Sequence, residues 1–77
     1  MLKAKMSQDP RILFGQRLTS IRKAKGQSQE QLALNSGIAR SYLSGIERGQ
    51  RNVALLNICK LAKTLGIPVS ELFRFDE

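Results

Sequence analysis

Apolar residues recur along this chain at intervals of three and four, the period of an amphipathic helix. The first stripe, between Pro10 and about Lys25, consists of Phe14, Leu18 and Ile21. Asp9 is suited to cap this helix and Pro10 to occupy its first turn, while Gly26 is suited to end it. The pattern therefore predicts a helix over residues 10–25.

Two shorter helices are predicted next, one from Gln29 to about Ser36 and one from Arg40 to about Glu47. Ser28 and Gln31 have the spacing of a capping box, in which each side chain accepts a hydrogen bond from the other residue's backbone amide. Ala39 precedes the second of these helices and has no capping side chain. The first helix of the pair thus has the more firmly defined start.

The last third of the chain predicts a fourth helix from Ala54 to Leu65, ended by Gly66, and a short fifth helix that begins near Pro68. The fifth helix runs through Leu72 and Phe73. One face of the fourth helix is predicted to carry Leu55, Ile58, Leu61, Ala62 and Leu65. No segment has the alternation of a strand, so the fold class is all-α with five helices.

The second and third helices have the residue pattern of a helix-turn-helix. Two helices that cross at a steep angle need a small residue at their contact and a residue that accepts a positive φ in the turn. Ala33 and Gly37 meet these two needs. The inward face is predicted to consist of Leu32, Ile38, Leu43 and Ile46. The alternative is an ordinary pair of core helices, because helical hairpins with a glycine turn are common.

The charge of the chain is +7 and is unevenly distributed. Residues 1–52 hold ten basic and three acidic residues, whereas residues 53–77 hold three of each. A polyanion is the natural partner of the basic half, either nucleic acid or an anionic membrane. No apolar stretch is long enough to span a membrane, and the basic start MLKAK lacks the core of a signal peptide. We expect a cytoplasmic protein with a flexible basic arm at residues 1–9 and one domain at 10–77.

The chain has no histidine and a single cysteine, Cys59. An internal disulfide is therefore impossible, and the spacing of a zinc site is missing. Cys59 lies in an apolar helical run and is predicted to be a buried structural thiol. The usual nucleophile and general-base arrangements are missing too, so we expect no enzyme and no cofactor.

With its five predicted helices and the words SQEQLA, SGI, SYLSGIERG and LAKTLGI, the chain resembles the lambda-repressor-like helix-turn-helix family of DNA-binding domains. The resemblance covers residues 11–73. It implies that the third helix enters the DNA major groove and that the protein binds palindromic sites as a homodimer. Segment RSYLSGIERGQRN is especially similar to the small controller proteins of restriction-modification systems.

The resemblance implies a set of DNA-binding residues. Gln29 would meet a backbone phosphate, and the exposed face of the recognition helix would carry Arg40, Ser41, Tyr42 and Ser44. Arg51 and Asn52 lie in the following loop, where relatives place residues on phosphates or at a neighbouring groove edge. An arginine can bind guanine through two parallel hydrogen bonds, although Arg40 could also be an ordinary solvated charge. Gly45 departs from relatives that carry a long polar residue at this position.

Two further roles follow from the resemblance. Arg22 and Glu47 match a partly buried salt bridge between the first and third helices, and Glu47 would repel phosphate unless it were neutralised. Relatives pair through their fourth and fifth helices. The candidate dimer contacts here are Leu56, Val69, Phe73 and Phe75, which could instead complete the core of the monomer.

We therefore expect a homodimeric, sequence-specific regulator of transcription that binds double-stranded DNA and no small-molecule ligand. A chain without room for a ligand-binding domain would respond to its own concentration, as an autoregulatory controller does. Two alternatives remain at this point: an antitoxin of a toxin–antitoxin pair, and an adaptor that uses the same fold to bind RNA or another protein.

Overall fold

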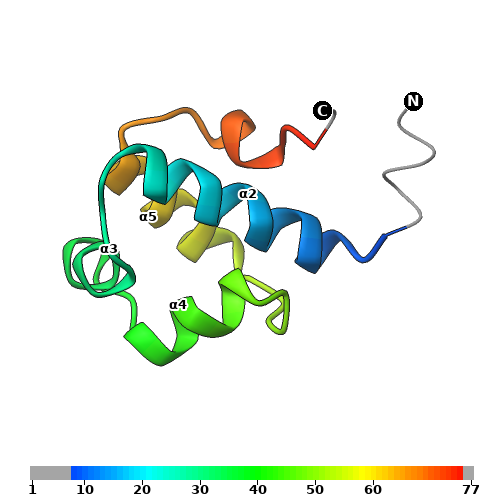
Figure 1. The fold of residues 1–77 in the computed structure, drawn as a ribbon, viewed down its shortest axis with the longest axis horizontal. Helices are drawn as coiled ribbons and strands as arrows, with labels where there is room; N and C mark the ends of the chain where they lie inside the picture. The colour runs from blue at the N-terminus through cyan, green and yellow to red at the C-terminus, as the bar shows by residue number, and fades with distance from the viewer. Residues whose placement is uncertain (1–7, 76–77) are drawn as a thin grey trace.

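The computed structural model describes residues 8–75, which form a bundle of four α-helices and one 3₁₀ helix (Figure 1). The predicted basic arm at residues 1–9 lies almost entirely outside this range. No strand is present in residues 8–75, as the sequence predicts. The elements are α2 (Pro10–Ala24), α3 (Gln29–Ser36), α4 (Arg40–Glu47), α5 (Leu55–Leu65) and η1 (Val69–Phe73).

The helix ends follow the predicted local signals. Asp9 caps α2 by accepting a hydrogen bond from the Arg11 amide, and Ser28 and Gln31 form the predicted capping box of α3. Gly37 ends α3 with a φ of +74° and Gly66 ends α5 with a φ of +70°, a backbone conformation that favours glycine. The fifth predicted helix is a 3₁₀ helix of five residues rather than an α-helix.

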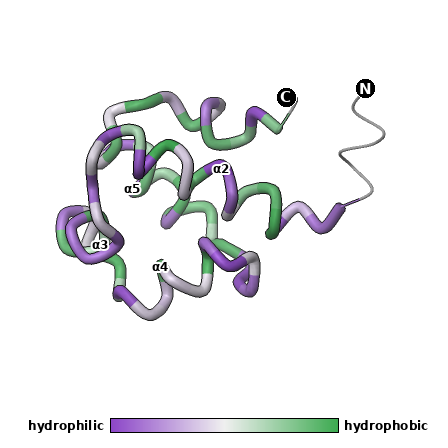
Figure 2. The backbone as a smooth tube through the Cα atoms, viewed as in Figure 1, coloured by the Kyte–Doolittle hydropathy of each residue, from purple (hydrophilic) through white to green (hydrophobic). Residues whose placement is uncertain are grey.

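The core lies where α2, α3, α4 and α5 converge, and η1 closes it from the other side of α2. The four predicted inward residues of the helix-turn-helix are all buried, which confirms its inward face. Figure 2 shows hydrophobic residues in both α2 and α5, and hydrophilic residues in the loop after α4. The six largest fully buried side chains are Leu18, Leu32, Leu43, Ile46, Leu61 and Leu72.

The approach of α2 to α4 depends on Gly15. A Cβ atom at this position would lie 2.7 Å from the carbonyl oxygen of Glu47 and closer still to that of Ile46. Because backbone atoms cannot move aside as a flexible side chain can, only glycine allows this contact. Gly15 thereby sets how closely the end of α4 packs against α2.

Two predictions about α5 are wrong. Leu55 was expected on the core face but is 71% exposed, and Cys59 was expected to be a buried thiol but is exposed. The other predicted residues do form the inward face of α5, with Leu61, Ala62 and Leu65 buried and Ile58 partly buried. No helix in the described part of the chain is both long and apolar enough to cross a membrane.

Candidate nucleic-acid interface

The exposed side of α4 carries the residues that the sequence predicts to face DNA. Leu43 and Ile46 anchor this helix in the core with at most 1% of their surface exposed. Arg40 and Ser41, at the start of the helix, are exposed. As expected for Ala39, no side chain caps α4. The helix is therefore held by its buried face and presents its first turn to solvent.

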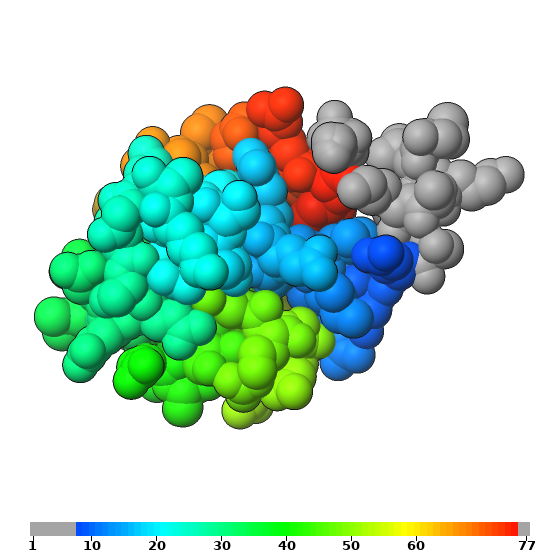
Figure 3. Space-filling model, in the orientation of Figure 1, coloured from blue at the N-terminus to red at the C-terminus, as the bar shows by residue number. Residues whose placement is uncertain are grey.

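The first residues of α3 and α4 lie side by side. Gln29, Arg40, Ser41 and Ser44 together line a shallow hollow of about 400 Å³. Figure 3 shows α3 and α4 forming one continuous part of the molecular surface. The structure thus brings four of the seven predicted DNA-binding residues together at one place.

A buried ion pair joins α2 to the end of α4. Arg22 Nε lies 2.6 Å from Glu47 Oε2, and Arg22 Nη2 lies 2.9 Å from Glu47 Oε1. The two side chains are only 8% and 4% exposed. Arg22 also donates to the carbonyl of Gln27, and Gln29 donates to Glu47 Oε1 at 2.8 Å. The pair that the resemblance implied is therefore present, with further hydrogen bonds on both of its members.

These contacts keep Glu47 ionised despite its burial. Burial raises the pKa of Glu47, but the hydrogen bonds that it accepts, above all from Arg22 and Gln29, and the positive charge of Arg22 together lower it by more, so that this pKa lies below the usual value for glutamate. The hydrogen bonds to Glu47 likewise raise the pKa of Arg22. The only acidic residue of α4 is thus neutralised and withdrawn from the surface that carries Arg40.

The arginines of the described chain divide into two groups. Four of them make ion pairs: Arg11 with Asp9, Arg17 and Arg74 with Glu71, and Arg22 with Glu47. The other three, Arg40, Arg48 and Arg51, have no acidic partner within residues 8–75, and all three are exposed. They lie on α4 or directly after it. The uncompensated guanidinium groups are therefore confined to one part of the fold.

Three predicted DNA-binding side chains on α3 and α4 also have partners within the protein. Gln29 contacts the buried ion pair, and Ser44 accepts a hydrogen bond from Arg48. Tyr42 is half-buried and packs against the core. Arg48 was not among the predicted DNA-binding residues, although its position directly after the recognition helix could have suggested it. Contact of these side chains with DNA stays a prediction.

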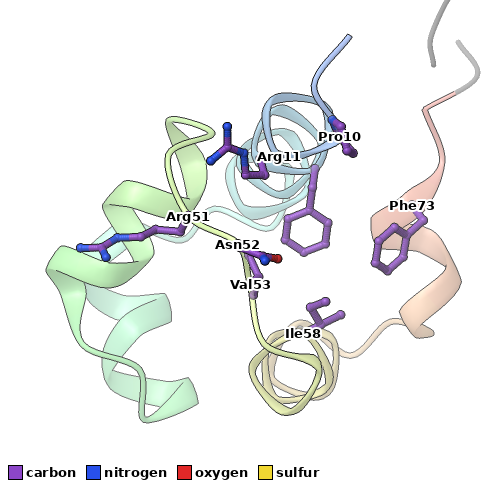
Figure 4. Close-up of a pocket in the computed structure, with 8 residues that line it drawn as sticks. Pro10, Arg11, Arg51, Asn52, Val53, Ile58 and Phe73 are labelled. Atoms are coloured by element: carbon purple, nitrogen blue, oxygen red, sulfur yellow. The ribbon is translucent and has the colours of Figure 1, made fainter. Parts of the chain in front are cut away.

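Arg51 and Asn52 lie apart from the hollow at the start of α4. Both residues border an apolar cavity of about 160 Å³ between the start of α2, the loop after α4, α5 and η1 (Figure 4). In that view Phe73 and Ile58 line the cavity, whereas the Arg51 side chain leaves the loop toward α4. Both loop residues are exposed, and Arg51 extends the α4 surface because its side chain lies against Gly45 and Tyr42.

The candidate dimer residues are not equivalent in the structure. Leu56 is 74% exposed, and Phe73 and Val69 are 46% and 37% exposed. Phe75 is half-buried and packs against the core, and the Phe73 ring lies 5.3 Å from the buried Phe14 ring between centroids. Of the four residues, Leu56 contributes least to the monomer core.

Comparison with known proteins identifies the family. The helix-turn-helix family model matches residues 18–72 of the chain. Control protein C.BamHI from Bacillus amyloliquefaciens is 46% identical over 71 residues, which cover 91% of this chain and 88% of that protein. The chain belongs to the helix-turn-helix family. This family consists of DNA-binding regulators rather than enzymes.

Solved structures of helix-turn-helix proteins share the fold. The restriction-modification controller protein C.AhdI from Aeromonas hydrophila is 60% identical with a TM-score of 0.81, and the match covers 82% of this chain and 96% of that one. The biofilm regulator SinR, solved in complex with DNA, is 40% identical with a TM-score of 0.74. The match covers 77% of this chain and 95% of the SinR chain. The predicted lambda-repressor-like fold, with its helix-turn-helix at the second and third helices, is thereby confirmed.

Proposed function

We propose that this chain is an autoregulatory controller of a restriction-modification system, acting in the cytoplasm as a homodimeric, sequence-specific DNA-binding protein. The observation that carries the DNA-binding part is the confinement of Arg40, Arg48 and Arg51 to α4 and the residues after it. Elsewhere in residues 8–75 each arginine has a carboxylate partner. Unpaired guanidinium groups around an exposed helix suit a polyanion, and the first turn of α4 suits a major groove.

The controller role is supported by the relatives. C.BamHI and C.AhdI are named as control or controller proteins, and this chain covers 88% and 96% of their lengths. These relatives therefore consist of little more than the domain described here. Regulation by the protein's own concentration follows naturally from such an architecture. No observation on this chain favours the antitoxin or the adaptor alternative over this role.

Homodimer formation is supported by apolar surface away from the basic side. Leu56 on α5 and Phe73 on η1 are large, exposed and apolar, and α5 contacts η1. Residues 53–77, which include both elements, have a net charge of zero, so two copies would not repel each other there. Pairing through this half would leave the α4 surfaces of both subunits available for DNA.

A selection from a pool of randomised duplex DNA, at about physiological salt, tests the proposal. We expect a palindromic motif whose half-sites lie roughly 34 Å apart, one turn of B-DNA, as twofold symmetry requires. Retention of sequences without any shared motif would contradict sequence-specific binding. A single, non-repeated motif would contradict the homodimer.

A further inference from the structure

Gly45 lies on the outward side of α4 and is nevertheless buried. Leu43 and Ile46 define the inward side of this helix, and a turn of roughly 100° per residue places Gly45 about 160° from Leu43 and about 100° from Ile46 around the helix axis, next to Ser41. A Cβ atom at Gly45 would meet Cγ and Nε of Arg51, both at 3.0 Å, and Cδ of the same side chain at 3.5 Å. Arg51 is therefore the residue that covers Gly45.

The far end of the Arg51 side chain lies over an aromatic ring. Its Cζ atom is 5.6 Å from the centroid of Tyr42, within the range of a cation–π contact. The Tyr42 ring packs against the core, so it offers a fixed platform. Figure 4 shows the side chain running from the loop toward α4 and away from the apolar cavity. A loop residue thus places a guanidinium on the outward face of the recognition helix.

We propose that Gly45 and Tyr42 are positioning residues that hold Arg51 on this face, where it determines base specificity together with Arg40. The inference rests on the proposed DNA-binding function. A side chain at position 45 would occupy the place of Arg51. Glycine at this position therefore leaves room for a DNA contact from the loop, where a larger residue would make one from the helix. A guanidinium held in one orientation can donate two parallel hydrogen bonds to O6 and N7 of guanine with little further loss of conformational freedom.

The alternative role for Arg51 is a phosphate contact, which would need only its charge. The observed packing favours base reading, because the guanidinium lies on the outward face of α4 rather than extending freely from the loop. The neighbouring Arg48 offers a matched comparison. It is exposed as well, but its guanidinium is hydrogen-bonded to Ser44 and to Gln50, and within residues 8–75 the cation–π contact with Tyr42 is made by Arg51 and not by Arg48.

The first experiment repeats the selection from randomised duplex DNA with wild type, Arg51→Ala and Arg48→Ala. Arg51→Ala should lose a guanine preference at one position in each half-site, and wild-type affinity for the preferred base there should exceed that of Arg51→Ala by about 5- to 150-fold. Arg48→Ala should keep all base preferences. If Arg51→Ala weakens binding to all sequences equally, Arg51 contacts phosphate and the inference is wrong. If wild type itself selects no motif, the proposed function fails instead.

The second experiment tests the positioning residues. Gly45→Leu adds an apolar side chain where Arg51 lies and should reproduce the base preferences of Arg51→Ala, with an unchanged thermal melting curve. Combining the two substitutions should cause no further loss of preference. Tyr42→Phe keeps the ring and should keep the preference, whereas Tyr42→Leu should lose it. Wild-type preferences in Gly45→Leu would show that Gly45 does not control Arg51.

Discussion

Arg22 and Glu47 join α2 to α4 through two parallel hydrogen bonds of 2.6 and 2.9 Å, in a place where both side chains are almost fully buried. The pair has two roles. It fixes the last turn of the recognition helix against the longest helix of the fold, and it removes a negative charge from the surface proposed to meet phosphate. Its members also bond Gln27 and Gln29, so the loop between α2 and α3 depends on it as well.

Removal of one member of this pair should destabilise the protein strongly. Arg22→Ala leaves the Glu47 carboxylate buried without its partner, which should lower the free energy of unfolding by about 3–5 kcal/mol. Arg17→Ala is the control, because the Arg17–Glu71 pair is about one third exposed and should contribute about 1 kcal/mol or less. Urea denaturation followed by circular dichroism measures both. Equal losses in the two variants would contradict the structural importance of the buried pair.

The same pair should make stability depend on acid pH. The pKa of Glu47 is lowered in the folded protein, so its contribution is complete above the unfolded-state pKa of about 4.3 and is lost as the pH falls through the lower folded-state pKa. Glu47→Gln should therefore show a shallower loss of stability between about pH 5 and pH 2. Asp9, whose pKa is also lowered, is present in both proteins and cancels in the comparison. Parallel pH profiles would exclude Glu47 as a source of this dependence.

Two helical glycines should respond in opposite ways to the same substitution. Gly15→Ala places a Cβ atom against the carbonyl oxygens of Ile46 and Glu47, and the forced separation of α2 from α4 should cost about 1–3 kcal/mol. Gly45→Ala meets only the flexible side chain of Arg51, and the better helix propensity of alanine should leave stability equal or up to about 1 kcal/mol higher. Thermal melting distinguishes the two. A stable Gly15→Ala protein would show that the helices can separate without cost.

The helix ends could be predicted from the sequence because capping is a local property. Asp9, Ser28, Gly37 and Gly66 each act on a backbone group within a few residues of themselves. The inward face of the helix-turn-helix could also be predicted from the sequence, because its apolar residues fall on one side of each helix only. For these elements, the local sequence is enough to predict where each helix begins and ends.

Contacts between distant segments could not be predicted in the same way. Apolar residues occur on several sides of α5, so their spacing does not reveal that Leu61 faces inward while Leu55 and Cys59 face solvent. The need for glycine at position 15 depends on carbonyl groups in α4, more than thirty residues away. The contact between Gly45 and Arg51 depends on the path of a loop. The candidate residues could therefore be named from the sequence, Arg51 in the loop included, whereas the contacts that hold Arg51 against α4 could not.

The exposed apolar residue of α5 should control dimer formation. Leu56→Glu introduces a charge at a position that contributes little to the monomer core, so the dissociation constant of the dimer should rise at least tenfold while the melting curve of the monomer is retained. Leu34→Glu is the matched control, because Leu34 is 81% exposed on α3 and the substitution changes the charge equally. Analytical ultracentrifugation over a range of concentrations gives both constants. Equal effects of the two substitutions would place the interface elsewhere.

Arg40 should read a base rather than only neutralise a phosphate. It is exposed at the start of α4, has no acidic partner within residues 8–75, and lies beside Ser41 in the hollow that faces outward from the helix-turn-helix. Arg40→Ala should weaken binding to the selected operator by about 1–3 kcal/mol and relax the base preference at one position of each half-site.

Arg40→Lys keeps the charge but not the paired hydrogen bonds. It should therefore keep the wild-type dependence of affinity on salt concentration while it loses the same base preference. Titration of labelled duplexes with all four bases at that position, at two salt concentrations, measures both properties. If Arg40→Lys discriminates between the bases as well as wild type does, charge alone accounts for the contribution of Arg40.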